Sequence, residues 1–139
     1  MNDRTAVHTE QAPAPFRGAP YSQAIKTEGL VFVSGQVSLR PDHGEIVGST
    51  IQEQTEQIMK NLAAILAEAG SDLGRLIKTT VFLTNLDDFQ GMNEVYARHV
   101  GETPPARATI EVGRLPSGAL VEIDAIAAVG SREPGSTTP

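Results

Sequence analysis

The sequence contains no cysteine and no tryptophan, and only 4% of its 139 residues are aromatic. The lack of cysteine excludes disulfides, thiol nucleophiles, zinc–cysteine sites and iron–sulfur clusters. The shortage of aromatic side chains leaves little for stacking on nucleic-acid bases or for an aromatic cage around a cation. A chain of this length buries roughly 68% of its unfolded surface, so one domain needs no crosslinks.

Long runs of one residue type are missing as well. Lys and Arg form no cluster, and the formal net charge is -6. Because nucleic-acid binding depends mainly on neutralising phosphates, we expect no nucleic-acid partner. No stretch approaches the roughly 18 apolar residues of a membrane span, and residues 1–16 lack the basic and apolar regions of a signal peptide. We therefore expect a cytoplasmic protein with no membrane partner.

The composition divides the chain into three parts. Residues 1–16 are polar and carry prolines, which predicts a flexible N-terminal arm. Residues 131–139 have the composition of a disordered tail. Residues 17–130 alternate between strand and helix patterns and are expected to form a single α+β domain.

The predicted elements are strands over 22–27 and 30–37, a helix over 51–69, a strand over 76–84, a helix from 87 or 88 to about 100, and strands over 105–112 and 119–126. Thr50 and Glu53 fit a capping box at the start of the first helix. An apolar stripe at helical spacing follows, and Gly70 ends the helix. This stripe comprises Ile58, Leu62, Ile65, Leu66 and Ala69.

The second helix starts at Asp87 or Asp88, either of which can cap it. Its expected buried side is Phe89, Met92, Tyr96 and Val100. Two helices can cover only one face of the mixed sheet, yet the last strand is largely apolar on both faces. We therefore expect the uncovered face to be buried against another copy of the chain, in a homo-oligomer.

Arg107 and Glu122 each stand on a mostly apolar strand, where a charge is expensive unless it is paired or used. Arg107 could form a structural ion pair with Glu122, Asp124 or Glu111. It could instead bind a substrate carboxylate through bidentate hydrogen bonds from its guanidinium. Glu122 could be the passive partner of Arg107, or it could orient and polarise a water molecule.

The register of the last two strands decides how these side chains meet. In a plain hairpin, Thr109 would stand opposite Glu122 and Arg107 opposite Asp124. Arg107 and Glu122 would then be diagonal neighbours, roughly 7 Å apart at the backbone. The connection is also long enough for the last strand to pair elsewhere in the sheet.

Other candidates have both a plain and a functional interpretation. Tyr21 could pack at the surface or aim its hydroxyl into a pocket, and Ser34 could be a small packing residue. Gly35 would let a ligand approach the backbone, and Asn93 could be a solvent contact in the helix. The three histidines, at positions 8, 43 and 99, make no metal-binding motif.

Several segments, in this order and spacing, resemble the Rid family of reactive intermediate deaminases. The resemblance covers about residues 19–128, and its most specific part is Pro105 to Val112 followed by Leu115-Pro116 and Val121-Glu122-Ile123. The other segments are Ala19-Pro20-Tyr21-Ser22-Gln23-Ala24, Leu30-Val31-Phe32-Val33-Ser34-Gly35-Gln36, Asp88-Phe89 and Met92-Asn93-Glu94-Val95-Tyr96.

The resemblance implies a chorismate-mutase-like α+β fold and a homotrimer with sites between subunits. It also implies hydrolysis of 2-imino acids such as 2-iminopropanoate and 2-iminobutanoate to 2-keto acids and ammonia. Arg107 would bind the carboxylate and Glu122 would position the water. Tyr21 would act beside them as a catalytic residue, while the substrate-binding pocket would also include Ser34, Gly35, Thr109, Asn93 and Phe89.

The sequence departs from the family pattern at two positions. Ala19 stands where glycine is usual before Pro-Tyr, and Thr109 stands where many members carry cysteine. Neither change affects the implied chemistry, which needs no metal or cofactor because an imine carbon is already electrophilic. The alternative is a non-catalytic trimer that binds small carboxylates such as keto acids. Ribonuclease and holdase activities are also described in this family, but the acidic charge argues against the first.

Overall fold

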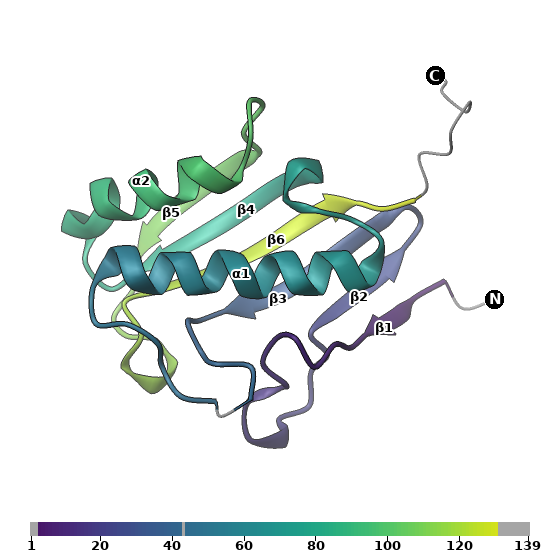
Figure 1. Ribbon diagram of the computed structural model, residues 1–139, viewed down its shortest axis with the longest axis horizontal. Coiled ribbons are helices and arrows are strands. Elements are labelled where there is room, and N and C mark those ends of the chain that lie inside the picture. The colour runs from purple at the N-terminus through teal and green to yellow at the C-terminus, as the bar shows by residue number, and fades with distance from the viewer. Residues whose placement is uncertain (1–2, 43, 131–139) are drawn as a thin grey trace.

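The computed structural model describes residues 3–42 and 44–130. In the described residues, one mixed sheet has the strand order β1-β2-β3-β6-β4-β5, and two α-helices pack on it (Figure 1). The strands are β1 (Thr5–Val7), β2 (Ala24–Thr27), β3 (Leu30–Gln36), β4 (Leu76–Leu83), β5 (Ala106–Glu111) and β6 (Val121–Ala128). The helices are α1 (Ile51–Ala69) and α2 (Phe89–His99). This confirms the predicted α+β class and places β6 in the interior of the sheet.

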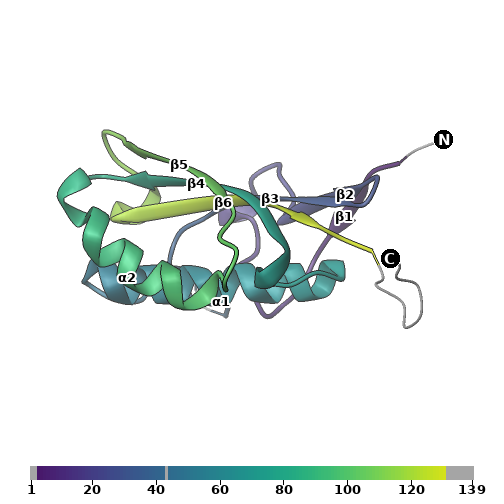
Figure 2. The same cartoon turned by 90° about the horizontal axis from the view of Figure 1, so that it is seen from above.

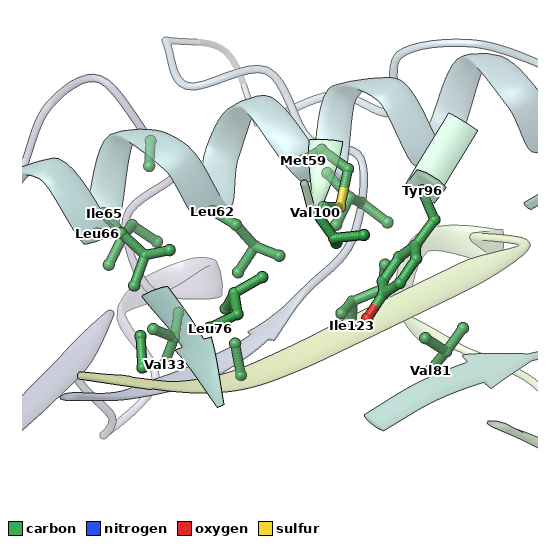
Figure 3. Packing of buried hydrophobic residues seen from close by; sticks show 14 of the residues in the cluster. Val33, Met59, Leu62, Ile65, Leu66, Leu76, Val81, Tyr96, Val100 and Ile123 are labelled. Carbon is green, nitrogen blue, oxygen red and sulfur yellow. The ribbon is translucent and has the colours of Figure 1, made fainter. Parts of the chain in front are cut away.

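Both helices lie on the same face of the sheet (Figure 2). The predicted stripe of α1, from Ile58 to Ala69, is buried there against Val121, Ile123 and other residues of the strands (Figure 3). The capping box of Thr50 and Glu53 is present, and Gly70 ends the helix in the left-handed conformation. Local sequence signals therefore set the limits of α1, and its apolar stripe holds it on the sheet.

The start of α2 differs from the prediction. Asp88 occupies the N-cap position but makes no side-chain hydrogen bond there. Asn85 instead accepts a hydrogen bond from the backbone N–H of Asp87, at the start of a short 3-10 turn that leads into the helix. Met92, Tyr96 and Val100 are buried as expected, but Phe89 is 39% exposed because it lies in the first turn of the helix, at the edge of the core.

The last two strands do not form a hairpin, because β4 lies between them. β5 pairs with β4 in parallel, with Arg107 beside Thr79, and β6 pairs with β4 antiparallel, with Glu122 beside Phe82. The hairpin register is therefore wrong, and the alternative, in which the last strand pairs elsewhere in the sheet, is confirmed. A parallel pair requires a crossover, and α2 provides it between β4 and β5.

The N-terminal segment is more ordered than its composition predicts. Thr5–Val7 forms the edge strand β1 on β2. The buried amide of Gln23 then donates to the carbonyls of Thr9, Ala12 and Pro13 and accepts from the N–H of Thr9. This single side chain replaces the regular backbone pairing that the prolines prevent. The predicted disordered tail, residues 131–139, lies outside the described residues.

No helix covers the sheet face opposite α1 and α2 within residues 3–42 and 44–130 (Figure 2), and we call it the uncovered face. Phe82 stands between Glu122 and Ile110 on this face, and Phe32 stands beside Ile126. Phe32 and Ile110 are 42% and 45% exposed. The face therefore combines exposed apolar side chains with the carboxylate of Glu122. Neither described helix is long and apolar enough to cross a membrane.

Candidate functional site

Arg107 lies on the helix-covered face, at the edge strand β5, and its guanidinium contacts three side chains of α2. Its Cζ atom is 4.9 Å from the ring centre of Tyr96 and 5.5 Å from that of Phe89. Nη1 also lies 3.9 Å from the sulfur of Met92. Aromatic faces attract a cation without neutralising its charge. The guanidinium therefore remains a net positive centre.

No carboxylate of the described residues forms a salt bridge with Arg107. Two of the three acids considered as partners have other contacts: Asp124 accepts from the N–H of Thr80 at 3.1 Å, and Glu111 accepts from the N–H of Leu86 at 2.9 Å. The structural ion pair, one of the two interpretations of Arg107, is thus absent from the described part of the chain.

Three other predicted site residues belong to the same region. Phe89 contacts Arg107 directly, and Asn93 follows one turn later on α2. Thr109 lies two residues beyond Arg107 on β5, on the same face, and is half-buried. The side chain of Asn93 makes no hydrogen bond to the described residues. We call this set of Arg107, Phe89, Asn93 and Thr109 the cation side.

Glu122 lies on the opposite face and lines a cavity of about 250 Å³. The cavity is mostly apolar, and its walls include Phe16, Tyr21, Gly35, Gln36 and Pro116. The pairing of β3 with β6 is irregular between Val33 and Gln36, and this irregularity brings Gly35 against the carboxylate. A Cβ atom at position 35 would collide with the Glu122 carboxyl, so any larger residue would have to displace that side chain.

Burial raises the pKa of the Glu122 carboxyl, and the nearby charge of Asp124 raises it further. The side chain has no hydrogen bond or ion pair with another described residue that would lower it. A carboxylate with a raised pKa is a better proton acceptor than an ordinary surface glutamate. Its surroundings therefore suit a general base.

Tyr21 and Ser34 are both held by the backbone near this cavity. The Tyr21 oxygen accepts a hydrogen bond from the Phe16 N–H at 2.8 Å, which leaves its own hydrogen free to be donated. The Ser34 hydroxyl donates to the carbonyl of Ser22 at 2.7 Å, so it ties β3 to the segment before β2. Of the two, Tyr21 lines the cavity. We call Tyr21, Ser34, Gly35 and Glu122 the carboxylate side.

The two sides do not meet within one chain. Along β4, Arg107 pairs with Thr79 and Glu122 pairs with Phe82, three residues apart, so they project from opposite faces of the sheet. The shared surface expected from the hairpin therefore does not exist in one protomer. Chemistry that uses both side chains needs a second copy to bring one side against the other.

Sequence reasoning missed Met92 and Tyr96 as partners of Arg107, and Phe16 and Pro116 as cavity walls. The spacing of Phe89, Met92 and Tyr96 along α2 was assigned to the buried side of the helix, which is correct for the last two. Nothing in that spacing shows that an arginine from a parallel strand would reach the same side chains.

The described residues contain no group of three or more histidine, aspartate or glutamate side chains placed to hold a metal ion. The polar groups available at the site are therefore one guanidinium, one carboxylate, hydroxyls, an amide and backbone groups. They can bind an anion and transfer a proton.

Comparisons with known proteins show the family to which the chain belongs. A family model described as Endoribonuclease L-PSP matches residues 9–129. The chain is 42% identical over 127 residues to the mouse protein named 2-iminobutanoate/2-iminopropanoate deaminase, covering 91% of this chain and 93% of that protein. It is 44% identical over 124 residues to the chloroplastic Reactive Intermediate Deaminase A of Arabidopsis thaliana, covering 89% of this chain and 65% of that protein.

Solved structures are similar in fold. The Rid family protein YyfA from Yersinia pestis has a TM-score of 0.86 at 42% identity, covering 91% of this chain and 99% of that chain. The structure of E. coli TdcF with bound serine has a TM-score of 0.84 at 38% identity, with the same two coverages. The chain therefore belongs to the Endoribonuclease L-PSP family, which includes the RutC and Rid proteins.

Proposed function

We propose that this protein hydrolyses reactive 2-imino acids, such as 2-iminopropanoate and 2-iminobutanoate, to 2-keto acids and ammonia. The observation that carries the proposal is the presence of two charged groups without an ionic partner in the described residues: the Arg107 guanidinium, and the half-buried Glu122 carboxyl with a raised pKa. The first suits the carboxylate of the substrate, and the second suits a water molecule. The similarity to the mouse imine deaminase supports this substrate class.

The working unit of this proposal is a homotrimer whose sites lie between subunits. Arg107 of one subunit would face Glu122 of its neighbour, because the two project from opposite faces of one sheet. The uncovered face, with Phe32 and Ile110 exposed, supports burial against another copy. A head-to-tail arrangement that closes into a ring gives each site one cation side and one carboxylate side.

In the proposed reaction, Arg107 binds the substrate carboxylate and thereby fixes the imine carbon beside Glu122. Glu122 removes a proton from water as the water oxygen attacks the carbon of the protonated imine, forming a tetrahedral aminoalcohol. Glu122 then passes this proton to the nitrogen. The hydroxyl gives its own proton to Glu122 as the carbon–oxygen double bond forms and ammonia leaves, and Glu122 releases that proton to solvent. Tyr21, whose oxygen is held by the Phe16 N–H, can donate its hydrogen to the developing intermediate. Orientation and fixed polar groups supply the catalysis.

The test uses an L-amino-acid oxidase to generate imines in the presence of semicarbazide, which traps them. The protein should lower semicarbazone formation from 2-iminobutanoate in proportion to its concentration, and Arg107→Ala should abolish this effect. Full activity of Arg107→Ala would reject the proposal. Gel filtration of the wild type and Arg107→Ala should give the same elution volume. This result would show that the substitution removes the site and does not dissociate the oligomer.

The second candidate is a non-catalytic protein that binds a small carboxylate, such as a keto acid, and reports it to a partner. The solved relative with bound serine favours an amino-acid-sized ligand without requiring turnover. Binding of 2-oxobutanoate together with no effect on semicarbazone formation would select this candidate. A nuclease function has no support in the charge of this chain, which is -6 overall.

A further inference from the structure

We infer that Tyr96 is a positioning residue that holds the Arg107 guanidinium in place for the incoming carboxylate; the functional meaning of this inference rests on the function proposed above. Tyr96 is only 5% exposed, and its ring extends from α2 toward the sheet (Figure 3). The guanidinium carbon of Arg107 lies 4.9 Å from the centre of that ring. Tyr96 thus acts on the ligand only through Arg107.

The position of the Tyr96 ring is set by a hydroxyl pair in the core. The Tyr96 oxygen and Thr79 Oγ1 are 2.6 Å apart, and Thr79 is fully buried. Thr79 is also the residue that stands beside Arg107 in the β4–β5 pair. A closed set of contacts therefore runs from the Arg107 backbone through Thr79 and the Tyr96 ring to the Arg107 side chain.

An anion-binding arginine must be held in one orientation without being neutralised. An internal carboxylate would orient the arginine but would also neutralise it and compete with the ligand. A free arginine would keep its charge but lose rotamer freedom when the ligand binds, which weakens binding. An aromatic ring fixed at its far end orients the guanidinium and leaves its N–H groups available. Phe89 and Met92 complete the contacts.

The experiment measures binding of 2-oxobutanoate, the stable keto-acid product, by calorimetry well below the melting temperature of each variant. Tyr96→Leu, which removes the ring, should raise the Kd about tenfold. Tyr96→Phe keeps the ring and should remain within about threefold of the wild type, because only the hydroxyl pair is lost. Near-normal affinity in Tyr96→Phe, together with weak binding in Tyr96→Leu, would show that the aromatic face positions Arg107.

Thr55→Val is the matched control for damage to the core. Thr55, like Thr79, is fully buried, and its hydroxyl donates to the Ile51 carbonyl at 2.7 Å, but it has no contact with Arg107. It should leave the Kd unchanged, whereas Thr79→Val should raise it as much as Tyr96→Phe does. Equal losses of affinity in Tyr96→Leu, Tyr96→Phe and Thr55→Val would overturn the inference, because they would indicate a general effect of core damage.

A second measurement does not depend on any ligand. The order parameter of the Arg107 Nε–H bond, from NMR relaxation, should fall in Tyr96→Leu and remain close to the wild-type value in Tyr96→Phe. An unchanged order parameter in Tyr96→Leu would overturn the positioning role. If the wild type binds no keto acid and hydrolyses no imine, the proposed function fails, and the order parameter still decides whether Tyr96 orients Arg107.

Discussion

Arg107 and Glu122 occupy the same sheet but differ in how the protein stabilises their charges. Arg107 is surrounded by two aromatic rings and a sulfur atom, none of which neutralises its charge. Glu122 lies in a mostly apolar cavity, where burial raises its pKa and makes it a proton acceptor. The cation side is therefore suited to binding an anion and the carboxylate side to transferring a proton, and we expect the acid limb of the activity profile to follow the pKa of Glu122.

The largest effect is expected from Arg107→Ala, which removes the charged partner of the substrate carboxylate. We expect kcat/KM to fall by about 3 kcal/mol, or roughly 150-fold, since a charged hydrogen-bonded partner is lost. Arg107→Lys keeps the charge but not the forked geometry and should recover only part of the loss. Full activity of Arg107→Lys would show that a point charge is sufficient, and it would contradict bidentate binding of the substrate carboxylate.

Glu122→Gln should remove proton transfer and leave the binding of the substrate carboxylate intact. The amide cannot accept the proton of the attacking water, so kcat should fall by about 100-fold. Binding of 2-oxobutanoate, measured by calorimetry, should survive because Arg107 is intact. Loss of both binding and hydrolysis would mean that Glu122 also binds the ligand. This would contradict the assignment of binding to the cation side and of proton transfer to the carboxylate side.

Phe32→Asp tests whether the two sides need a second copy. A carboxylate in the middle of the uncovered apolar face should dissociate the oligomer and lower activity by at least about tenfold, because burying an unpaired charge is costly. Sedimentation velocity would report the assembly. Lys60→Gln is the control: it makes the same change in net charge on an exposed position of α1. A Phe32→Asp protein that is monomeric yet fully active would show that one chain holds a complete site.

The smallest effect is expected from Asp124→Asn, which alters only the pKa of Glu122. The charge of Asp124 raises that pKa, but burial is the larger cause, so its removal should lower the pKa only in part. Catalysis requires ionised Glu122 and is lost as the pH falls through its pKa. The acid limb of the kcat/KM profile should therefore move to lower pH, by less than it would if burial were also removed. The asparagine oxygen can still accept from the Thr80 N–H. A shift to higher pH would contradict the assigned cause.

Sequence patterns predicted most of the fold because most of its signals are local. The capping box at Thr50 and Glu53, the stripe of α1 and the stop at Gly70 all depend on residues close together in the chain, and all are present. The hairpin of β5 and β6 was wrong because strand order depends on contacts far apart in sequence. The order of the N-terminal segment was missed because it depends on distant partners: β1 pairs with β2, and Gln23 holds residues 9–13.

The candidate site was predicted as a set of residues but not as a geometry. Arg107 and Glu122 could be recognised in the sequence because each is a charged residue on a mostly apolar strand, which is rare. Parity along a strand could not place them on opposite faces, because that placement depends on the insertion of β4 between β5 and β6. The roles of these side chains and the expected cytoplasmic location stay predictions.

The most direct test of the central claim, that Arg107 and Glu122 act together across a subunit boundary, is complementation between two inactive variants. Arg107→Ala and Glu122→Gln are mixed in equal amounts, dissociated, reassembled and assayed for imine hydrolysis. In a closed ring of subunits, random assembly pairs an intact Arg107 with a neighbour's intact Glu122 at about one quarter of the sites. We expect recovery of about one quarter of the wild-type activity. No recovery after complete exchange of subunits would contradict the claim, because the two residues would then have to act within one chain.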